Sequence, residues 1–182
     1  MIRVARAHLN VDAQSHAGMT GKNNEDRYAV ASFVLDQRDR VPVLFAVLAD
    51  GIGGHRAGEV AAELAVNHLM QAVARSDGRH IRQTIEDAVI EASDAIAAHA
   101  GANENLKGMG ATCATAWIVG RGWTPWKTVG GRPSVVGGFG SAIASHGGEL
   151  YVGAPRASNF SASSCRFSLA EMRFVCAFLL RS

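Results

Sequence analysis

The sequence predicts an α+β fold in which a helix pair covers one face of a mainly antiparallel sheet. Three observations support this: a continuous apolar run at residues 43–49, apolar side chains at helical spacing between residues 57 and 100, and a strand pattern at residues 111–119. Hydrophobic residues make up 48% of the chain and charged residues 19%, which is typical of a globular protein.

The N-terminal part of the chain holds three strand patterns. Residues 2–8 alternate in part and predict a first strand, whereas residues 12–24 are rich in Gly, Ser, Asn and Thr and predict a loop. Residues 27–35 alternate between two faces and predict a second strand. The apolar run at residues 43–49 has the length and flanks of a strand that is buried on both faces.

Two helices are expected between the third and fourth strands. Residues 57–74 and residues 81–100 repeat apolar side chains at helical spacing, and Asp77 and Gly78 separate the two. The order is therefore strand, strand, strand, helix, helix, strand, which suits a layered α+β domain. After the fourth strand, only residues 169–180 predict a regular element, either a helix or a buried strand.

Charge and composition change near residue 120. Residues 1–120 carry 14 acidic and 11 basic residues, whereas residues 121–182 carry 2 acidic and 7 basic residues and no aspartate. The second part is also rich in glycine and lacks a sustained period. We therefore expect a domain at residues 1–120 and an atypical tail at residues 121–182, which is either aberrant (frameshifted, truncated or disordered) or a divergent segment kept by selection.

Several classes of function are disfavoured by composition. A net charge of only +2 gives no electrostatic case for binding nucleic acid. The apolar run at residues 174–180 is far shorter than the ~20 residues that a membrane span needs, and the N-terminus shows no signal peptide. The three cysteines have no metal-ligand spacing and form no complete disulfide framework. We expect a cytoplasmic protein without membrane or nucleic-acid partners.

The first candidate functional cluster is the acidic run at residues 23–26. Glu25 and Asp26 lie at the end of a loop just before a strand, where adjacent carboxylates repel unless a cation or hydrogen-bond donors lie between them. Taken alone, this cluster is better explained as an Asx-type turn with a solvated acidic tip.

The second candidate cluster begins with Asp50, directly after the buried strand. An unpaired charge is costly there, and a divalent cation would compensate it. The glycines that follow, starting with Gly51, would let a backbone carbonyl turn toward the same ion, and oxygen ligands suit Mg²⁺ or Mn²⁺. An equally good interpretation of this segment alone is that Asp50 stabilises the turn or caps the next helix.

A phosphate-binding glycine loop is the obvious competitor in this strand–turn–helix context. Gly53 and Gly58 have the Walker spacing, but Glu59 and Val60 follow in place of Lys and Ser/Thr. The dinucleotide-binding pattern would need Gly or Ala where Arg56 stands. Nucleotide binding is therefore disfavoured.

Together the two clusters are far more specific than either one. The motifs NNED at residues 23–26, ADGIGGHRAGE at residues 49–59 and GMGAT at residues 108–112 resemble the PP2C family of metal-dependent protein phosphatases, in the right order over about residues 15–120. The resemblance implies a PP2C-like layered β-sandwich with helices on both outer faces. It also implies a two-metal site with Mg²⁺ or Mn²⁺, at which phosphoserine and phosphothreonine in proteins are hydrolysed. The implied partners are a phosphoprotein substrate and, with it, a Ser/Thr kinase or its targets.

The resemblance also assigns residues. The implied catalytic residues are Asp50, Glu25 and Asp26, and the implied metal ligands are Asp50, the carbonyl of Gly51 and Glu25. Lys22 and His55 are weaker candidates for contacts with phosphate, and an exposed loop histidine is an alternative for His55.

The sequence departs from the family pattern in three ways. Gly21 stands where the family has a phosphate-binding arginine, no aspartate follows Asp94, and the chain is shorter than a full PP2C domain. Two functions therefore stay open: a PP2C-like phosphatase, inactive if the truncation removes its ligands, and a non-catalytic phosphoprotein-binding module or pseudophosphatase fragment.

Overall fold

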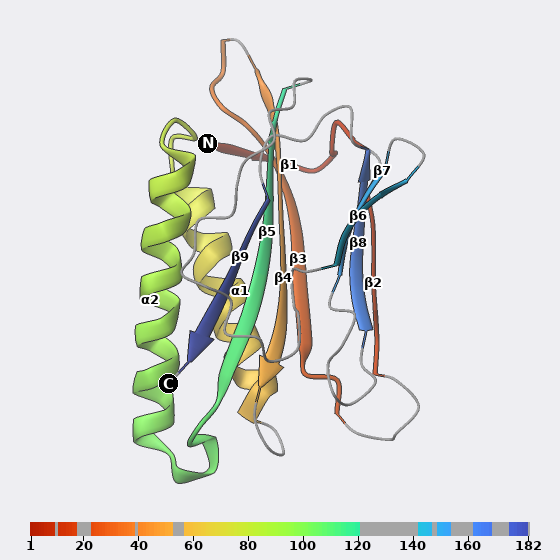
Figure 1. Cartoon of the computed structure of the whole chain (residues 1–182). Helices are drawn as coiled ribbons and strands as arrows, with labels where there is room; N and C mark the ends of the chain where they lie inside the picture. The colour runs from red at the N-terminus through yellow and green to blue at the C-terminus, as the bar shows by residue number, and fades with distance from the viewer. Residues whose placement is uncertain are drawn as a thin grey trace.

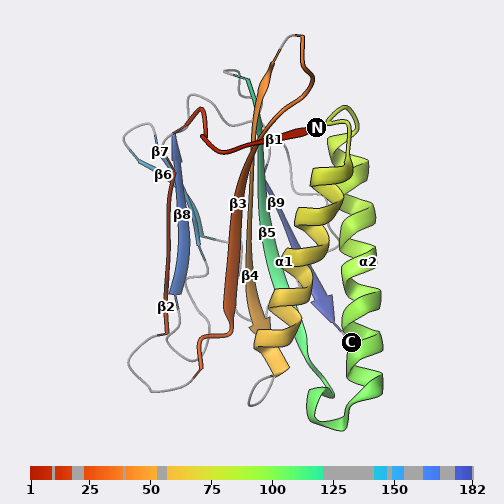
Figure 2. The ribbon, with the colours of Figure 1, turned by 180° about the vertical axis from the view of Figure 1, so that it is seen from behind.

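The structure is a computed structural model that describes residues 1–9, 11–17, 23–38, 40–52, 57–120, 142–146, 149–153, 162–168 and 175–181. The described elements form three layers (Figures 1 and 2). A five-stranded sheet lies in the middle, with two helices on one face and a four-stranded sheet on the other. The predicted layered α+β fold is confirmed.

The central sheet has the strand order β1-β3-β4-β5-β9, and all of its pairings are antiparallel. The strands are β1 (Ile2–Val4), β3 (Asp26–Val34), β4 (Pro42–Ile52), β5 (Gly110–Val119) and β9 (Val175–Arg181). The four strands expected in the first 120 residues are all present. The open choice at residues 169–180 resolves as a strand, since β9 pairs with β5.

The second sheet has the order β2-β8-β7-β6 and is also antiparallel. Its strands are β2 (Asp12–His16), β8 (Ala162–Ser168), β7 (Glu149–Gly153) and β6 (Ala142–His146). The loop expected at residues 12–24 was wrong for β2. Its partner β8 lies about 150 residues away in the chain, so no local pattern could reveal the pairing.

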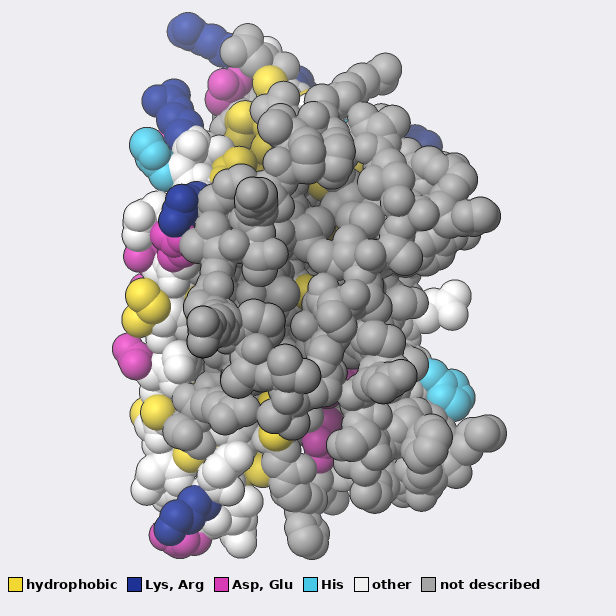
Figure 3. Space-filling view, viewed as in Figure 1, with side chains coloured by type: hydrophobic (Ala, Val, Ile, Leu, Met, Phe, Trp, Pro, Cys, Tyr) yellow, Lys and Arg dark blue, Asp and Glu magenta, His cyan; other side chains and the backbone are white. Residues whose placement is uncertain are grey.

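The helices are α1 (Ala57–Arg75) and α2 (Ile81–Ala102), followed by the short 3₁₀ helix η1 (Glu104–Leu106). Small side chains bring α1 close to the sheet, because the alanines at positions 57, 61, 62 and 65 are fully buried. Charged side chains of both signs line the edge of the molecule formed by α2 (Figure 3). None of the described helices is long and apolar enough to cross a lipid bilayer.

Successive side chains of β4 point to opposite faces of the central sheet, so the hydrophobic core has two parts. Phe45, Val47 and Ala49 belong to the cluster packed under the helices, whereas Leu44 and Leu48 belong to the cluster between the two sheets. Nearly every residue of β4 is buried, as expected for a strand covered on both faces. Asp50 is an even-numbered residue of β4 like Leu44 and Leu48, so its side chain lies on the same face, toward the second sheet.

The resemblance implied helices on both outer faces of the sandwich. In the part of the chain that the structure describes, α1 and α2 cover the outer face of the central sheet, and no described helix lies on the second sheet. Strands β6 to β9 come from the segment that composition set apart as a tail. The division at residue 120 stays a prediction.

Candidate functional site

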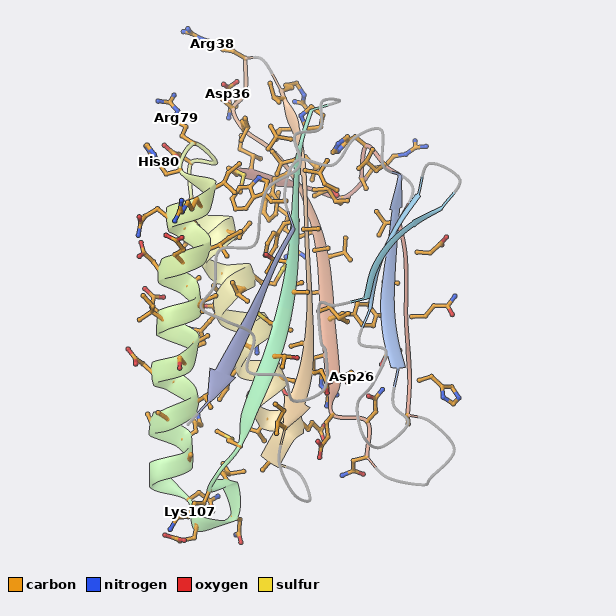
Figure 4. The ribbon with its side chains drawn as sticks, viewed as in Figure 1. Asp26, Asp36, Arg38, Arg79, His80 and Lys107 are labelled. Carbon is orange, nitrogen blue, oxygen red and sulfur yellow. The ribbon has the colours of Figure 1, made fainter. Side chains whose placement is uncertain are left out.

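Two buried aspartates lie side by side where β3 begins and β4 ends. Asp26 and Asp50 are direct cross-strand partners, so their side chains leave the sheet on the same face. Their relative exposures are only 3% and 9%. Figure 4 shows Asp26 at the end of β3 that is opposite the hairpin with Asp36 and Arg38. Two carboxyl groups are thus held together in the space between the sheets.

The electrostatic state of this pair is unusual. The pKa of Asp50 is raised from 3.8 to about 7, first by burial, then by the negative charge of Asp26 and a hydrogen bond with its side chain, and then by the charge of Glu25. The Asp50 carboxyl therefore keeps its proton to a higher pH than an ordinary aspartate does. A cation placed between the carboxylates would compensate the same repulsion.

The loop before β3 is fixed against the start of α1. The backbone N–H of Gly51 donates to the carbonyl oxygen of Glu25 at 3.2 Å. A Cβ atom built on Gly58 would lie 2.5 Å from Oε2 of Glu25, and one built on Gly51 would collide with the carbonyl oxygen of Gly58. Both glycines are therefore required by close packing. The Glu25 carboxylate lies beside the first turn of α1, where the helix dipole favours negative charge.

Arg27 joins the acidic loop to α1. Its guanidinium forms an ion pair with Glu59, in the first turn of the helix, and donates to the carbonyl oxygens of Asn24 at 3.0 Å and Asp26 at 2.9 Å. The side-chain oxygen of Asn24 accepts from the N–H of Asp26 at 3.0 Å. This is the Asx turn that the acidic run predicted, but the predicted solvation of its acidic tip is wrong for Asp26, which is buried. The role of Arg27 was missed, although a basic residue directly after Glu25 and Asp26 was a visible signal.

The structure decides one alternative for Asp50. A helix N-cap lies immediately before the first helical residue, which is Ala57 in α1. Asp50 lies inside β4, two residues before its end, and its carboxyl hydrogen-bonds with Asp26. It therefore does not cap α1.

Four of the six predicted site residues come together: Glu25, Asp26, Asp50 and Gly51. The other two, Lys22 and His55, lie outside the described residues. Within the described ranges, no group of three or more His, Cys, Asp and Glu side chains is arranged to hold a metal ion. The Asp26–Asp50 pair and nearby carbonyl oxygens fit one hard cation only in part, because such ions take about six oxygen ligands, several of them from water.

Comparisons with known proteins identify the family of this chain. The family model "Protein phosphatase 2C" matches residues 14–130. The serine/threonine phosphatase stp of Listeria innocua is 30% identical over 112 residues, which are 59% of this chain and 42% of that protein. The serine/threonine protein phosphatase PstP of Mycobacterium tuberculosis is 32% identical, over 62% of this chain and 20% of that protein. The chain thus spans less than half the length of these relatives.

Two solved structures are similar to parts of this chain. The serine/threonine phosphatase of S. agalactiae is 30% identical, with a TM-score of 0.51 over 63% of this chain and 46% of that chain. The catalytic domain of PstP, solved in complex with 2 manganese ions, is 27% identical with a TM-score of 0.49, over 80% of this chain and 46% of that chain. Because the family model matches well over half of the residues, this chain belongs to the protein phosphatase 2C family.

Proposed function

We propose that this chain carries the acidic part of a PP2C-type active site, which hydrolyses phosphoserine and phosphothreonine in proteins with Mg²⁺ or Mn²⁺. The buried Asp26–Asp50 pair carries the proposal, because two carboxyl groups pressed together away from solvent are costly without a cation. Membership of the family supports the reaction, and the named relatives are serine/threonine phosphatases.

Asp50 and Asp26 would hold the cation, together with the Gly51 carbonyl and with Glu25 acting directly or through water. When bound, the divalent ion supplies an acidified water molecule and neutralises charge on the phosphoryl oxygens. Asp50 contributes a carboxylate that is already fixed by β4 and by its neighbours on β3. Arg27 and Glu59 hold the acidic loop and the start of α1 at a constant distance, so that the carboxylates keep their geometry.

A non-catalytic, phosphoprotein-binding descendant is the second candidate function. The observation that favours it is the lack of a set of three or more metal-ligating side chains among the described residues. Fewer carboxylates would weaken the affinity for a hard cation. A kinase partner and a cytoplasmic location stay predictions.

Hydrolysis of p-nitrophenyl phosphate by the full chain, with and without Mn²⁺, distinguishes these functions. We expect Mn²⁺-dependent turnover in the wild type, a loss of at least about 100-fold in Asp50→Asn, and unchanged turnover in Asp94→Asn, whose carboxylate is exposed on α2. A folded wild type without turnover would favour the non-catalytic function. Equal turnover in Asp50→Asn would contradict the proposed site.

A further inference from the structure

A threonine on the neighbouring strand continues the row of acidic side chains. Thr112 of β5 is the direct cross-strand partner of Asp50, which is itself the partner of Asp26. Antiparallel partners share a face of the sheet, so the three side chains lie in one row across β3, β4 and β5, in the space toward the second sheet. Thr112 belongs to the GMGAT motif, but sequence reasoning gave it no role.

The hydroxyl of Thr112 is in an unusual state. Its Oγ1 atom is buried and makes no hydrogen bond with any described residue. Buried hydroxyl groups in folded proteins are nearly always hydrogen-bonded, and one that is not calls for an explanation. The register places several groups on the neighbouring strands beside this hydroxyl.

Those groups leave one acceptor side chain. On β4, the positions diagonal to Thr112 are Leu48 and Ile52, which are apolar, and the position directly opposite is Asp50. On β9, the residue opposite Thr112 in the register is a leucine, Leu179. On these two strands, the only side-chain acceptor that directly faces the hydroxyl is therefore the carboxyl group of Asp50.

We propose that Thr112 is a positioning residue, whose hydroxyl donates a hydrogen bond to the carboxylate of Asp50 when Asp50 holds the divalent cation. A cation held by Asp50 and Asp26 would leave one oxygen of Asp50 able to accept from Thr112. Hydrogen bonds to carboxylates are strong, and partners of this kind fix the orientation of metal ligands.

The inference rests on the proposed function, because it assigns Thr112 a role toward the same cation. The alternative to a positioning role is a purely structural one, in which Thr112 is a β-branched residue that packs well in a strand. Two substitutions separate these roles. Thr112→Val keeps the shape and removes the hydroxyl, whereas Thr112→Ser keeps the hydroxyl and removes a methyl group.

Thr115 supplies a matched control on the same strand. Its Oγ1 atom is also buried without a hydrogen-bond partner among the described residues, and Thr115 is almost fully buried. Its odd-numbered position places it on the opposite face, toward the helices and away from Asp50. Thr115→Val therefore removes an equivalent hydroxyl that cannot reach the site.

The test is the affinity of the full chain for Mn²⁺, measured from the electron paramagnetic resonance signal of free Mn²⁺. We expect Thr112→Val to weaken binding by about 10- to 100-fold, Thr112→Ser to restore it to near the wild-type value, and Thr115→Val to leave it unchanged. Circular dichroism checks that each variant is folded. If Thr112→Val does not fold, the comparison of Thr112→Ala with Thr112→Ser gives the same answer.

Wild-type affinity in Thr112→Val would overturn the inference, and so would equal weakening in Thr112→Ser and Thr112→Val, since that points to packing. These outcomes differ from failure of the proposed function. If the wild type binds Mn²⁺ and Asp50→Asn does not, the cation site stands and only the role of Thr112 is being judged. If the wild type does not bind Mn²⁺, the cation site is contradicted, and the role of Thr112 with it.

Discussion

Among single residues, Asp50 combines burial with two acidic neighbours. Its pKa of about 7 means that folding of the metal-free chain favours the protonated form of this carboxyl. In the unfolded chain the same group titrates near 3.8. The difference makes the stability of the metal-free protein depend on pH in a direction that can be calculated.

The folded state binds the Asp50 proton more tightly than the unfolded state does. The contribution of this proton to the free energy of unfolding is therefore fully present below about pH 4 and is lost as the pH rises through about 7. We expect the urea concentration at the unfolding midpoint, measured in EDTA, to decrease as the pH is raised from about 4 to about 8. The decrease should be larger in the wild type than in Asp50→Asn. The asparagine variant keeps the shape but cannot titrate. Parallel midpoint curves for the two proteins would contradict the assignment.

Among the elements, the contact between β4 and α1 determines where the acidic loop lies. Gly51 at the end of β4 packs against Gly58 in the first turn of α1, and both lie against Glu25. There is no room for a side chain at either glycine. The same two backbone segments hold Glu25 beside Asp50.

This packing predicts the effect of Gly51→Ala. The new Cβ would meet the carbonyl oxygen of Gly58 and lie 2.9 Å from that of Glu25, and both are backbone atoms that cannot rotate away. We expect a loss of about 1–3 kcal/mol in the free energy of unfolding, measured in urea, and weaker Mn²⁺ binding. The matched control is Gly101→Ala in α2, where a Cβ meets nothing within 4 Å and alanine favours the helix by about 1 kcal/mol. Equal stability of Gly51→Ala and wild type would contradict this account of the packing.

Elements with a strong local period could be predicted from the sequence, whereas elements defined by distant partners could not. The helices at residues 57–75 and 81–102 and the strand at residues 42–52 follow from apolar spacing, because each buries a face that the sequence marks. Strand β2, with sequence DAQSH, has mostly exposed side chains, and its ladder is made with residues 162–166. The polar sequence of β2 does not predict its pairing with β8.

In the candidate site too, some residues could be predicted from the sequence and some contacts could not. Glu25, Asp26 and Asp50 could be named because the motifs NNED and ADGIGGHRAGE resemble those of the PP2C family, whereas the acidic run taken alone favoured a solvated turn. The ion pair of Arg27 with Glu59, and the register that puts Thr112 beside Asp50, depend on how β3, β4, β5 and α1 meet. Neither follows from spacing along the chain.

Across the whole molecule, the two sheets enclose the face that carries the acidic pair. Leu44 and Ile118 of the central sheet pack between the sheets with Leu9, which precedes β2. Asp26 and Asp50 lie on the same face of the central sheet and are themselves buried, so their carboxyl groups are largely removed from solvent. Electrostatic interactions are strong in such a place, both between the two acids and with any cation they hold.

The chain spans 42% of the stp phosphatase of Listeria innocua. The acidic pair is built entirely within β3 and β4, so its affinity for a cation can be tested in the full chain as it stands. The central claim is that Asp26 and Asp50 form a cation site.

The most direct test of that claim is the thermal unfolding midpoint of the full chain at neutral pH, measured in EDTA and in increasing Mn²⁺. A cation bound only by the folded state raises the midpoint as its concentration rises. We expect this rise in the wild type and in Asp94→Asn, and its loss in Asp50→Asn and Asp26→Asn. A midpoint that does not respond to Mn²⁺ in the wild type, or that rises equally in Asp50→Asn, would contradict the claim.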